Sequence, residues 1–208
     1  AMLEVLDASI GRILDRVDAL GLGRNTMVVF FSDNGQLGPK DSLPLRGSKA
    51  DLYEGGIRSP MIVKWPGQVP AGAVQDTPVI SNDFLPTFAT LAGVAELPPD
   101  VDGVDLSGLI ADPLADLERD ALFFHFPHYH SQGLGPQGAI RAGDLKLIEY
   151  YERSMLGEEG AYELYDLKTD LAERNNLADE EPERVKELAE KLQAWKQAVG
   201  AQEMTLPE

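Results

Sequence analysis

The stretch that decides the fold of this chain runs from Thr26 to Gly67 and reads TMVVFFSDNGQLGPKDSLPLRGSKADLYEGGIRSPMIVKWPG. It opens with an apolar run that lacks polar alternation, which predicts a parallel strand buried on both faces. Asp33 and Asn34 follow directly, at the carboxyl end of that strand. Ligands of open α/β sheets bind outside this end of the strands. We therefore expect a functional site here, with Lys49 arriving from the next part of the stretch.

The residue types in this stretch suit a metal and an anion. The side chains of Asp33 and Asn34 offer hard oxygen ligands of the kind that calcium and magnesium prefer. Lys49 offers a point charge for an oxyanion. An ordinary turn at Asp33–Gly35 and a solvated Lys49 are the alternatives, since Asp, Asn and Gly all favour turns. The stretch predicts half of an anion-plus-metal site, and the other half is not in the chain.

Composition limits the classes of partner. The chain has 208 residues, 18 Lys and Arg against 35 Asp and Glu, and a formal net charge of −17. This charge opposes binding to nucleic acid and to anionic membranes, so we expect neither partner. No apolar run reaches the roughly 18 residues of a membrane helix. The absence of cysteine excludes disulfides, thiolate metal sites and a cysteine nucleophile within the chain, but leaves the compartment open.

Apolar periodicity and turn residues predict the remaining elements. Residues 2–20 have the spacing of an amphipathic helix that Gly21 ends, and Ser81 is a candidate cap for a helix over 82–91. A final helix over about 180–199 has Asp179 as its expected cap and Pro182 in its first turn. Between these helices, short aromatic or β-branched runs predict an antiparallel meander. The runs are 121–126, 138–142, 145–151 and 161–166.

The fold class is therefore α/β, with a partial sheet edge followed by a small antiparallel sheet that packs with a carboxyl-terminal helix. We expect three parts: residues 1–70 as the end of a larger α/β core, 71–114 as a connecting segment with one helix, and 115–208 as the antiparallel sheet and its helix.

An ordered set of motifs resembles the sulfatases, members of the alkaline phosphatase superfamily. The set begins with Ser32-Asp33-Asn34-Gly35, then Lys49, and then Glu54-Gly55-Gly56-Ile57-Arg58. It continues with Asp83–Thr87, Asp102–Leu106, Glu163–Leu167 and Asn176–Ala178, so the resemblance covers nearly the whole chain. It implies an alkaline-phosphatase-like sheet edge and hydrolysis of sulfate esters in a small molecule or carbohydrate.

The resemblance also implies roles for individual residues. Asp33 and Asn34 would be two ligands of a calcium ion, and Lys49 would contact the sulfate group or its bridging oxygen. His128, in the histidine-rich run 124–130, would lie at the substrate rim. Zinc is a weaker alternative for that run, because alternation along a strand separates His125 from His128 and His130. Glu54 and Arg58 are interpreted as a bracing pair, beside glycines that permit close backbone approach or positive φ.

Parts that the family requires are missing. Sulfatases carry a Cys-x-Pro-Ser-Arg type motif, whose cysteine becomes formylglycine, and an Asp-Asp pair for the metal; this chain has neither. We therefore expect the chain alone to be inactive. The Ala1-Met2 start indicates a truncated reading frame behind a tag residue, or else proteolysis of a longer protein.

Two further readings stay open. One is a fragment of a phosphodiester or phosphonate hydrolase of the same superfamily. The other is a non-catalytic remnant that self-associates through its exposed sheet edge.

Overall fold

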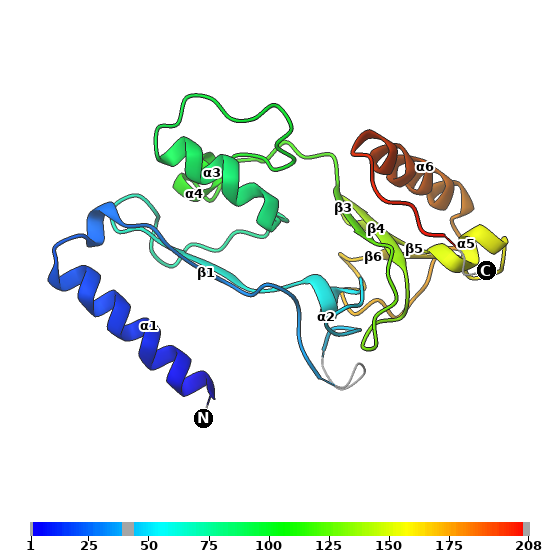
Figure 1. Cartoon of the computed structure of the whole chain (residues 1–208), viewed down its shortest axis with the longest axis horizontal. Helices are drawn as coiled ribbons and strands as arrows, with labels where there is room; N and C mark the ends of the chain where they lie inside the picture. Colours follow the sequence, from blue (N-terminus) through cyan, green and yellow to red (C-terminus); the bar gives the residue numbers. More distant parts are fainter. Residues whose placement is uncertain (1, 39–43, 206–208) are drawn as a thin grey trace. The chain divides into compact units, whose positions relative to one another are not determined.

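The computed structural model describes residues 2–38 and 44–205. The chain divides into two compact units (Figure 1). The amino-terminal unit joins the residues up to Phe31 with Pro60–Glu118, and the carboxyl-terminal unit joins Ser32–Ser59 with the residues from Arg119 onward. The segment that carries Asp33, Asn34 and Lys49 therefore belongs to the carboxyl-terminal unit. The domain boundaries near residues 70 and 115 stay predictions.

The amino-terminal unit is built from short elements around one long helix. Strands β1 and β2 pair antiparallel, with Val28 opposite Lys64 and Phe31 opposite Met61. Within the residues described, no helix is long and apolar enough to cross a membrane. The elements are α1 (Met2–Ala19), the 3₁₀ turn η1 (Gly23–Asn25), β1 (Val28–Phe31), β2 (Met61–Lys64), η2 (Ser81–Asp83), α3 (Phe84–Leu91) and α4 (Ser107–Ala111).

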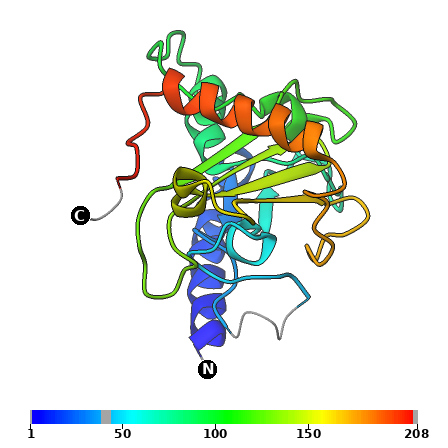
Figure 2. The same ribbon diagram turned by 90° about the vertical axis from the view of Figure 1, so that its right-hand side faces the viewer.

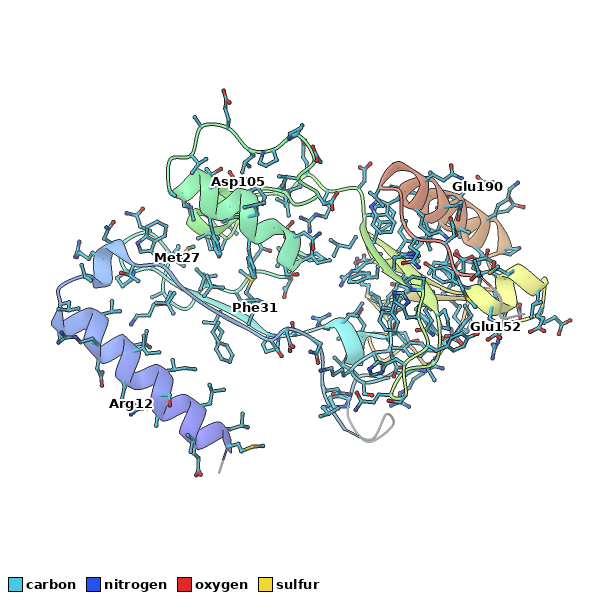
Figure 3. The ribbon with its side chains drawn as sticks, in the orientation of Figure 1. Arg12, Met27, Phe31, Asp105, Glu152 and Glu190 are labelled. Carbon is cyan, nitrogen blue, oxygen red and sulfur yellow. The ribbon has the colours of Figure 1, made fainter. Side chains whose placement is uncertain are left out.

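The strand after η1 differs from the prediction. It pairs antiparallel with β2, and Phe30 and Phe31 are exposed, whereas the apolar run predicted a parallel strand buried on both faces (Figure 3). The physical reason is that an apolar run indicates only that a strand tends to be buried. The direction of pairing depends on which strand lies beside it in the fold. A strand buried on both faces also needs a covering layer on each side, and the amino-terminal unit does not supply both.

Helix α1 forms as predicted and ends at Gly21, whose φ of 68° is the left-handed conformation of a helix stop. No residue of α1 is buried, so its apolar stripe lies open within the part of the chain described. Met2, Leu3, Val5, Leu6 and Ile13 are all exposed large apolar residues.

The start of α3 is held by Asp83, and the prediction of Ser81 as its cap is wrong. The buried Asp83 carboxylate accepts hydrogen bonds from the backbone N–H of Ile80 at 2.9 Å and of Val104 at 3.0 Å. Thr87 Oγ1 accepts a further bond from the Leu106 N–H at 2.9 Å. The motif 83–87 is therefore hydrogen-bonded to the motif 102–106.

The carboxyl-terminal unit confirms the predicted meander. Its strands β3 (Leu122–Phe126), β4 (Gln137–Ala142), β5 (Leu145–Tyr150) and β6 (Tyr162–Asp166) pair antiparallel in the order β3-β4-β5-β6. Helix α5 (Tyr151–Leu156) follows β5 without a break and was not predicted. Helix α6 (Pro182–Ala198) closes the chain. Its Pro182 lies in the first turn as predicted, but its cap residue is Glu181 and not Asp179.

The meander buries apolar side chains on both faces, because successive residues of a strand point to opposite sides. One face packs against α6, through Ile140, Leu147, Leu164, Leu188 and Leu192. The opposite face packs against the segment before α2 (Glu54–Ile57), through residues that include Leu52, Tyr53, Ala139, Ile148 and Tyr165. Figure 2 shows α6 lying across the strands. The described residues of the segment 32–59 thus form one layer of this unit, which supports the loop that carries the candidate site.

Candidate functional site

The loop after β1 is held by backbone hydrogen bonds to α2. The Gly35 N–H donates to the Gly56 carbonyl at 2.7 Å, and the Gln36 N–H donates to the Gly55 carbonyl at 2.8 Å. The two residues just before this anchor are the predicted metal ligands. Asp33 is exposed and Asn34 is half-buried, so their oxygens lie at the surface of a fixed loop.

The glycines of this loop are required by close approach. A Cβ on Gly35 would lie 2.1 Å from the Gly55 carbonyl oxygen, and one on Gly56 would lie 2.1 Å from the Asp51 carbonyl oxygen. A Cβ on Gly55 would lie 2.3 Å from the Arg46 carbonyl oxygen. None of these three glycines has a positive φ. The sequence allowed either close backbone approach or positive φ as the reason for the glycine pair, and the structure shows close backbone approach.

Gln36 connects the metal-ligand loop to Lys49. The Gln36 carbonyl accepts a hydrogen bond from the Lys49 N–H at 2.8 Å. Its side-chain amide donates to the carbonyls of Leu45 at 3.1 Å and Gly47 at 3.0 Å. Lys49 itself is exposed, so its ammonium can meet a ligand. Sequence reasoning missed Gln36, although its position directly after Asp-Asn-Gly was a signal.

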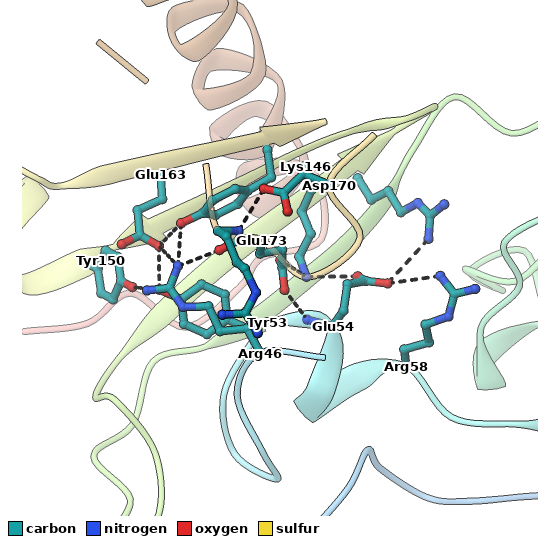
Figure 4. A network of polar contacts seen from close by, with 12 residues as sticks. Arg46, Tyr53, Glu54, Arg58, Lys146, Tyr150, Glu163, Asp170 and Glu173 are labelled. Carbon is teal, nitrogen blue, oxygen red and sulfur yellow. Dashed lines mark hydrogen bonds and ion pairs between the residues drawn. The ribbon is translucent and has the colours of Figure 1, made fainter. Parts of the chain in front are cut away.

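A buried ion cluster connects α2 to β5 (Figure 4). Lys146 is fully buried on β5, with its Nζ 3.0 Å from Glu54 Oε1 and 2.9 Å from Glu173 Oε1. Glu173 Oε2 also accepts a hydrogen bond from the Glu54 N–H at 2.6 Å. Arg58 lies 3.4 Å from Glu54, which agrees with the predicted pair, and Arg141 lies 3.9 Å away.

The cluster places two carboxylates around one buried ammonium. Burial raises the pKa of Glu173, and the nearby Lys146 opposes that rise. Glu54 is the residue immediately before the two glycines that hold Gly35 and Gln36, so the cluster fixes the far end of the same loop. Sequence reasoning assigned Glu54 and Arg58 to each other and missed Lys146 and Glu173.

The three histidines lie apart, but not through alternation along one strand, because β3 ends at Phe126. His125 lies on β3, where its ring hydrogen-bonds to the Tyr151 hydroxyl at 2.6 Å and to the Gln202 carbonyl at 2.8 Å. His128 and His130 are exposed beyond the end of β3, and their rings contact Phe126. Across residues 2–38 and 44–205, no three His, Asp or Glu side chains gather closely enough to hold a metal ion.

The loop that carries His128 reaches the segment of Lys49. A Cβ on Gly133 would lie 2.7 Å from the carbonyl oxygen of Ala50, the residue after Lys49. Three separate stretches therefore meet in the carboxyl-terminal unit: the loop of Asp33 and Asn34, the segment of Lys49, and the loop after β3.

Two family models match this chain. Residues 48–198 match the family described as N-sulphoglucosamine sulphohydrolase, C-terminal, and residues 1–94 match the family described as Sulfatase. The chain belongs to the sulfatase family. The region that the first model describes is the carboxyl-terminal portion of such enzymes.

Individual sulfatases match over almost the whole chain. A sulfatase of Formosa agariphila is 36% identical over 94% of this chain, and the match covers 38% of that protein. An N-acetylgalactosamine-6-O-sulfatase of Bacteroides thetaiotaomicron is 32% identical over 92% of the chain and 40% of its own length. The solved structure of a protein in complex with its substrate D-glucosamine-2-N,6-O-disulfate superposes with a TM-score of 0.78 at 29% identity, over 94% of this chain and 39% of that one. The chain thus spans about two fifths of these sulfatases.

Proposed function

We propose that this chain is the carboxyl-terminal part of a sulfatase that hydrolyses sulfate esters of carbohydrates when complete, and that the chain alone is inactive. The observation that carries the proposal is the hydrogen-bonded unit in which Gln36 joins the Asp33–Asn34 loop to Lys49. The names of the relatives support a sulfated sugar as the substrate class, because one acts on N-acetylgalactosamine 6-O-sulfate groups and another binds a disulfated glucosamine.

In the complete enzyme, Asp33 and Asn34 would supply two oxygen ligands to calcium. Both residues fit that role, since they are adjacent, bear hard oxygen donors and sit at the surface of a braced loop. The ion supplies positive charge near the sulfate group when bound. Lys49 would hold its ammonium near the sulfate oxygens, where charge develops as the ester bond breaks. His128 would contact the substrate from the loop that touches Ala50.

The proposed inactivity follows from missing groups. The chain has no cysteine to become formylglycine, no Ser-x-Pro-Ser-Arg or Ser-x-Ala-Ser-Arg equivalent and no Asp-Asp pair. Calcium takes about six to eight oxygen ligands, and two side chains do not meet that need. Calorimetric titration of the chain with calcium should therefore give a dissociation constant above about 1 mM.

The test supplies what is missing. The chain, fused behind the amino-terminal part of the Formosa agariphila relative, should hydrolyse an aryl sulfate in the presence of calcium, whereas the chain alone should not. Lys49→Ala should lower the turnover of the fusion by roughly 100-fold or more, the usual effect of losing a group that stabilises transition-state charge. Lys168→Ala is the matched control, because Lys168 is a solvent-exposed lysine of the same unit.

Three outcomes would count against the proposal. Turnover by the chain alone that Lys49→Ala abolishes would contradict the inactivity. A fusion whose turnover does not depend on Lys49 would contradict the role of that residue. Hydrolysis of an aryl phosphodiester or phosphonate in preference to the sulfate would favour the other branch of the superfamily.

The open apolar stripe of α1 favours a second behaviour for the lone chain, which is self-association. Leu3, Leu6 and Ile13 are exposed on one helix, and β1 adds exposed Phe30 and Phe31. Sedimentation should show a dimer or larger species that Ile13→Glu reduces to monomer. Leu114→Glu is the control, since Leu114 is a highly exposed leucine away from these elements.

A further inference from the structure

The carboxyl-terminal unit contains a small polar pocket that none of the roles above uses. Its volume is about 370 Å³, near the lower end of the roughly 300–1,000 Å³ of ligand pockets in proteins. That size suits a single small ring. The polar groups that line it are Arg46, Tyr53, Tyr150, Glu152, Arg153 and Glu163.

The floor of the pocket is fixed by a chain of hydrogen bonds (Figure 4). The Tyr53 hydroxyl donates to Glu163 Oε2 at 2.5 Å, and the Tyr165 hydroxyl donates to the same oxygen at 2.8 Å. Arg46 donates to the Tyr165 hydroxyl at 2.7 Å. Tyr53 and Tyr165 are buried, so the groups are set in place before any ligand arrives.

This series of hydrogen bonds also leaves acceptor oxygens in the pocket that a ligand can use. The oxygens of Tyr53 and Tyr150 are 2.6 Å apart. Because the proton of Tyr53 is directed at Glu163, Tyr150 is the donor of this pair, and its oxygen keeps lone pairs that can accept. Tyr53, Tyr165 and Arg46 all meet Glu163 at its Oε2, and Tyr150 also interacts with this carboxylate, so Glu163 is an acceptor shared by several groups of the pocket.

The charges of the pocket cancel. Two arginines face two glutamates, and each guanidinium lies over a tyrosine ring, Arg46 at 4.0 Å from the centre of Tyr53 and Arg153 at 5.0 Å from that of Tyr150. A pocket without excess positive charge, in a chain of net charge −17, does not select an anion. Donors and acceptors crowded together match the adjacent hydroxyls of an uncharged ring.

The pocket borders the loop that carries His128. Leu134 and Pro136 of that loop line the pocket, and Gly133 of the same loop lies against Ala50, next to Lys49. Partial desolvation and the neighbouring Glu152 raise the pKa of Tyr129, which ties the start of the loop to the pocket rim. One loop therefore joins the proposed sulfate site to this pocket.

We propose that the pocket binds a neutral, hydroxylated sugar ring that adjoins the sulfated ring of a carbohydrate substrate. This assignment of a second sugar site rests on the proposed function. It makes Arg153 and Glu152 the ligand contacts at the rim, since both are exposed residues of α5. Figure 3 labels Glu152 on this helix.

The test measures binding and not turnover. The chain is titrated with four neutral sugars, namely N-acetylgalactosamine, N-acetylglucosamine, galactose and glucose, while the backbone amide signals of Leu134 and Tyr150, which line the pocket, are followed by NMR. At least one sugar should bind with a dissociation constant on the order of 10 mM. Arg153→Gln should weaken that binding roughly tenfold, the effect of losing one hydrogen bond from a charged group. Glu152→Gln should weaken it in the same direction.

The controls separate the possible failures. Arg184→Gln should leave binding unchanged, because Arg184 is likewise an exposed arginine on a helix of this unit, and it pairs with Glu187 rather than lining the pocket. N-acetylgalactosamine 6-sulfate should bind the pocket no more tightly than the neutral sugar. Tighter binding of the sulfated sugar that Arg153→Gln removes would overturn the proposal in favour of an anion site. No response to any neutral sugar up to about 100 mM would overturn it outright, and would leave the fusion assay of the proposed function unaffected.

Discussion

Replacing Lys146 by methionine tests the buried cluster that supports the candidate site. After this change, Glu54 still has two cationic partners, Arg58 at 3.4 Å and Arg141 at 3.9 Å. Glu173 loses its ion pair with Lys146 and keeps the hydrogen bond from the Glu54 N–H. Removing one partner of a buried ion pair usually costs about 3–5 kcal/mol, because the charge left behind has no water to solvate it. We expect the free energy of unfolding of the carboxyl-terminal unit to fall by about that amount at pH 7.5.

The pH dependence of this loss has a definite sign. Burial already raises the pKa of Glu173, and removal of Lys146 raises it further. A carboxyl group with a raised pKa in the folded state adds stability below its unfolded pKa and loses that stability as pH rises through the folded value. The Lys146→Met variant should therefore be closest to the wild type near pH 5 and furthest from it at pH 7.5. Each unit by which the pKa of Glu173 in the folded state exceeds its unfolded value corresponds to about 1.4 kcal/mol in the free energy of unfolding.

Urea unfolding followed by tryptophan fluorescence can measure this loss. The chain has two tryptophans. In a Trp65→Phe background the signal comes from Trp195, which stacks on Phe123 in the carboxyl-terminal unit. Lys168→Met is the matched control, since its pair with Asp144 is exposed and spans 3.9 Å, and exposed pairs contribute about 0–1 kcal/mol.

A second substitution sharpens the comparison. Adding Glu173→Gln to Lys146→Met should restore part of the lost stability, because it removes the uncompensated charge. A loss below about 1 kcal/mol, or an equal loss at both pH values, would refute the description of the cluster as buried charges that depend on one another.

Three further predictions concern the loop, the tyrosines and the core. Gly35→Ala should destabilise the chain by about 1–3 kcal/mol in urea unfolding, since its Cβ would lie 2.1 Å from a carbonyl oxygen; Gly11→Ala, which has open space, should instead stabilise α1 by about 0.5–1 kcal/mol. Burial raises the pKa of Tyr150 to about 12 and raises the pKa of Tyr53, Tyr151, Tyr162 and Tyr165 above the ordinary value. In the absorbance titration of the native chain, these five tyrosines should thus ionise above pH 10, and the free energy of unfolding should fall as pH rises above about 10; a step near pH 10 with the amplitude of all six tyrosines would contradict the burial of these rings. Leu192→Ala should cost about 2–5 kcal/mol, because Leu192 is the fully buried residue of α6 that packs against the sheet, whereas Val199→Ala, at an exposed position, should change the free energy of unfolding little.

Much of the candidate site was predictable because its signals are local. The apolar run, Asp33-Asn34-Gly35, Lys49 and the glycine pair stand in a fixed order, and that order pointed to the sulfatases before any contact was known. Close approach at the glycines and the pair between Glu54 and Arg58 agree with the sequence interpretation. The roles of Asp33, Asn34, Lys49 and His128 stay proposals.

What escaped prediction depends on contacts between distant residues. Lys146 sits in an ordinary alternating strand and resembles a surface lysine, yet it meets Glu54 from 92 positions away. Glu173 lies in a polar stretch, and it bonds to the Glu54 N–H across 119 positions. The antiparallel pairing of β1 with β2 could likewise not be predicted, because an apolar run does not indicate which strand it pairs with.

The sequence by itself determined the meander, the two long helices and the family, because alternation, helical spacing and motif order are properties of neighbouring residues. The tertiary structure decided which side chains meet. It placed Lys146 between two carboxylates, used Gln36 to bind the segment of Lys49 to the loop of Asp33 and Asn34, and opened a neutral pocket beside the loop of His128. The physical reason is that a buried charge or a close backbone approach is stable only when its partners are present, and the chain supplies those partners from segments far apart in sequence.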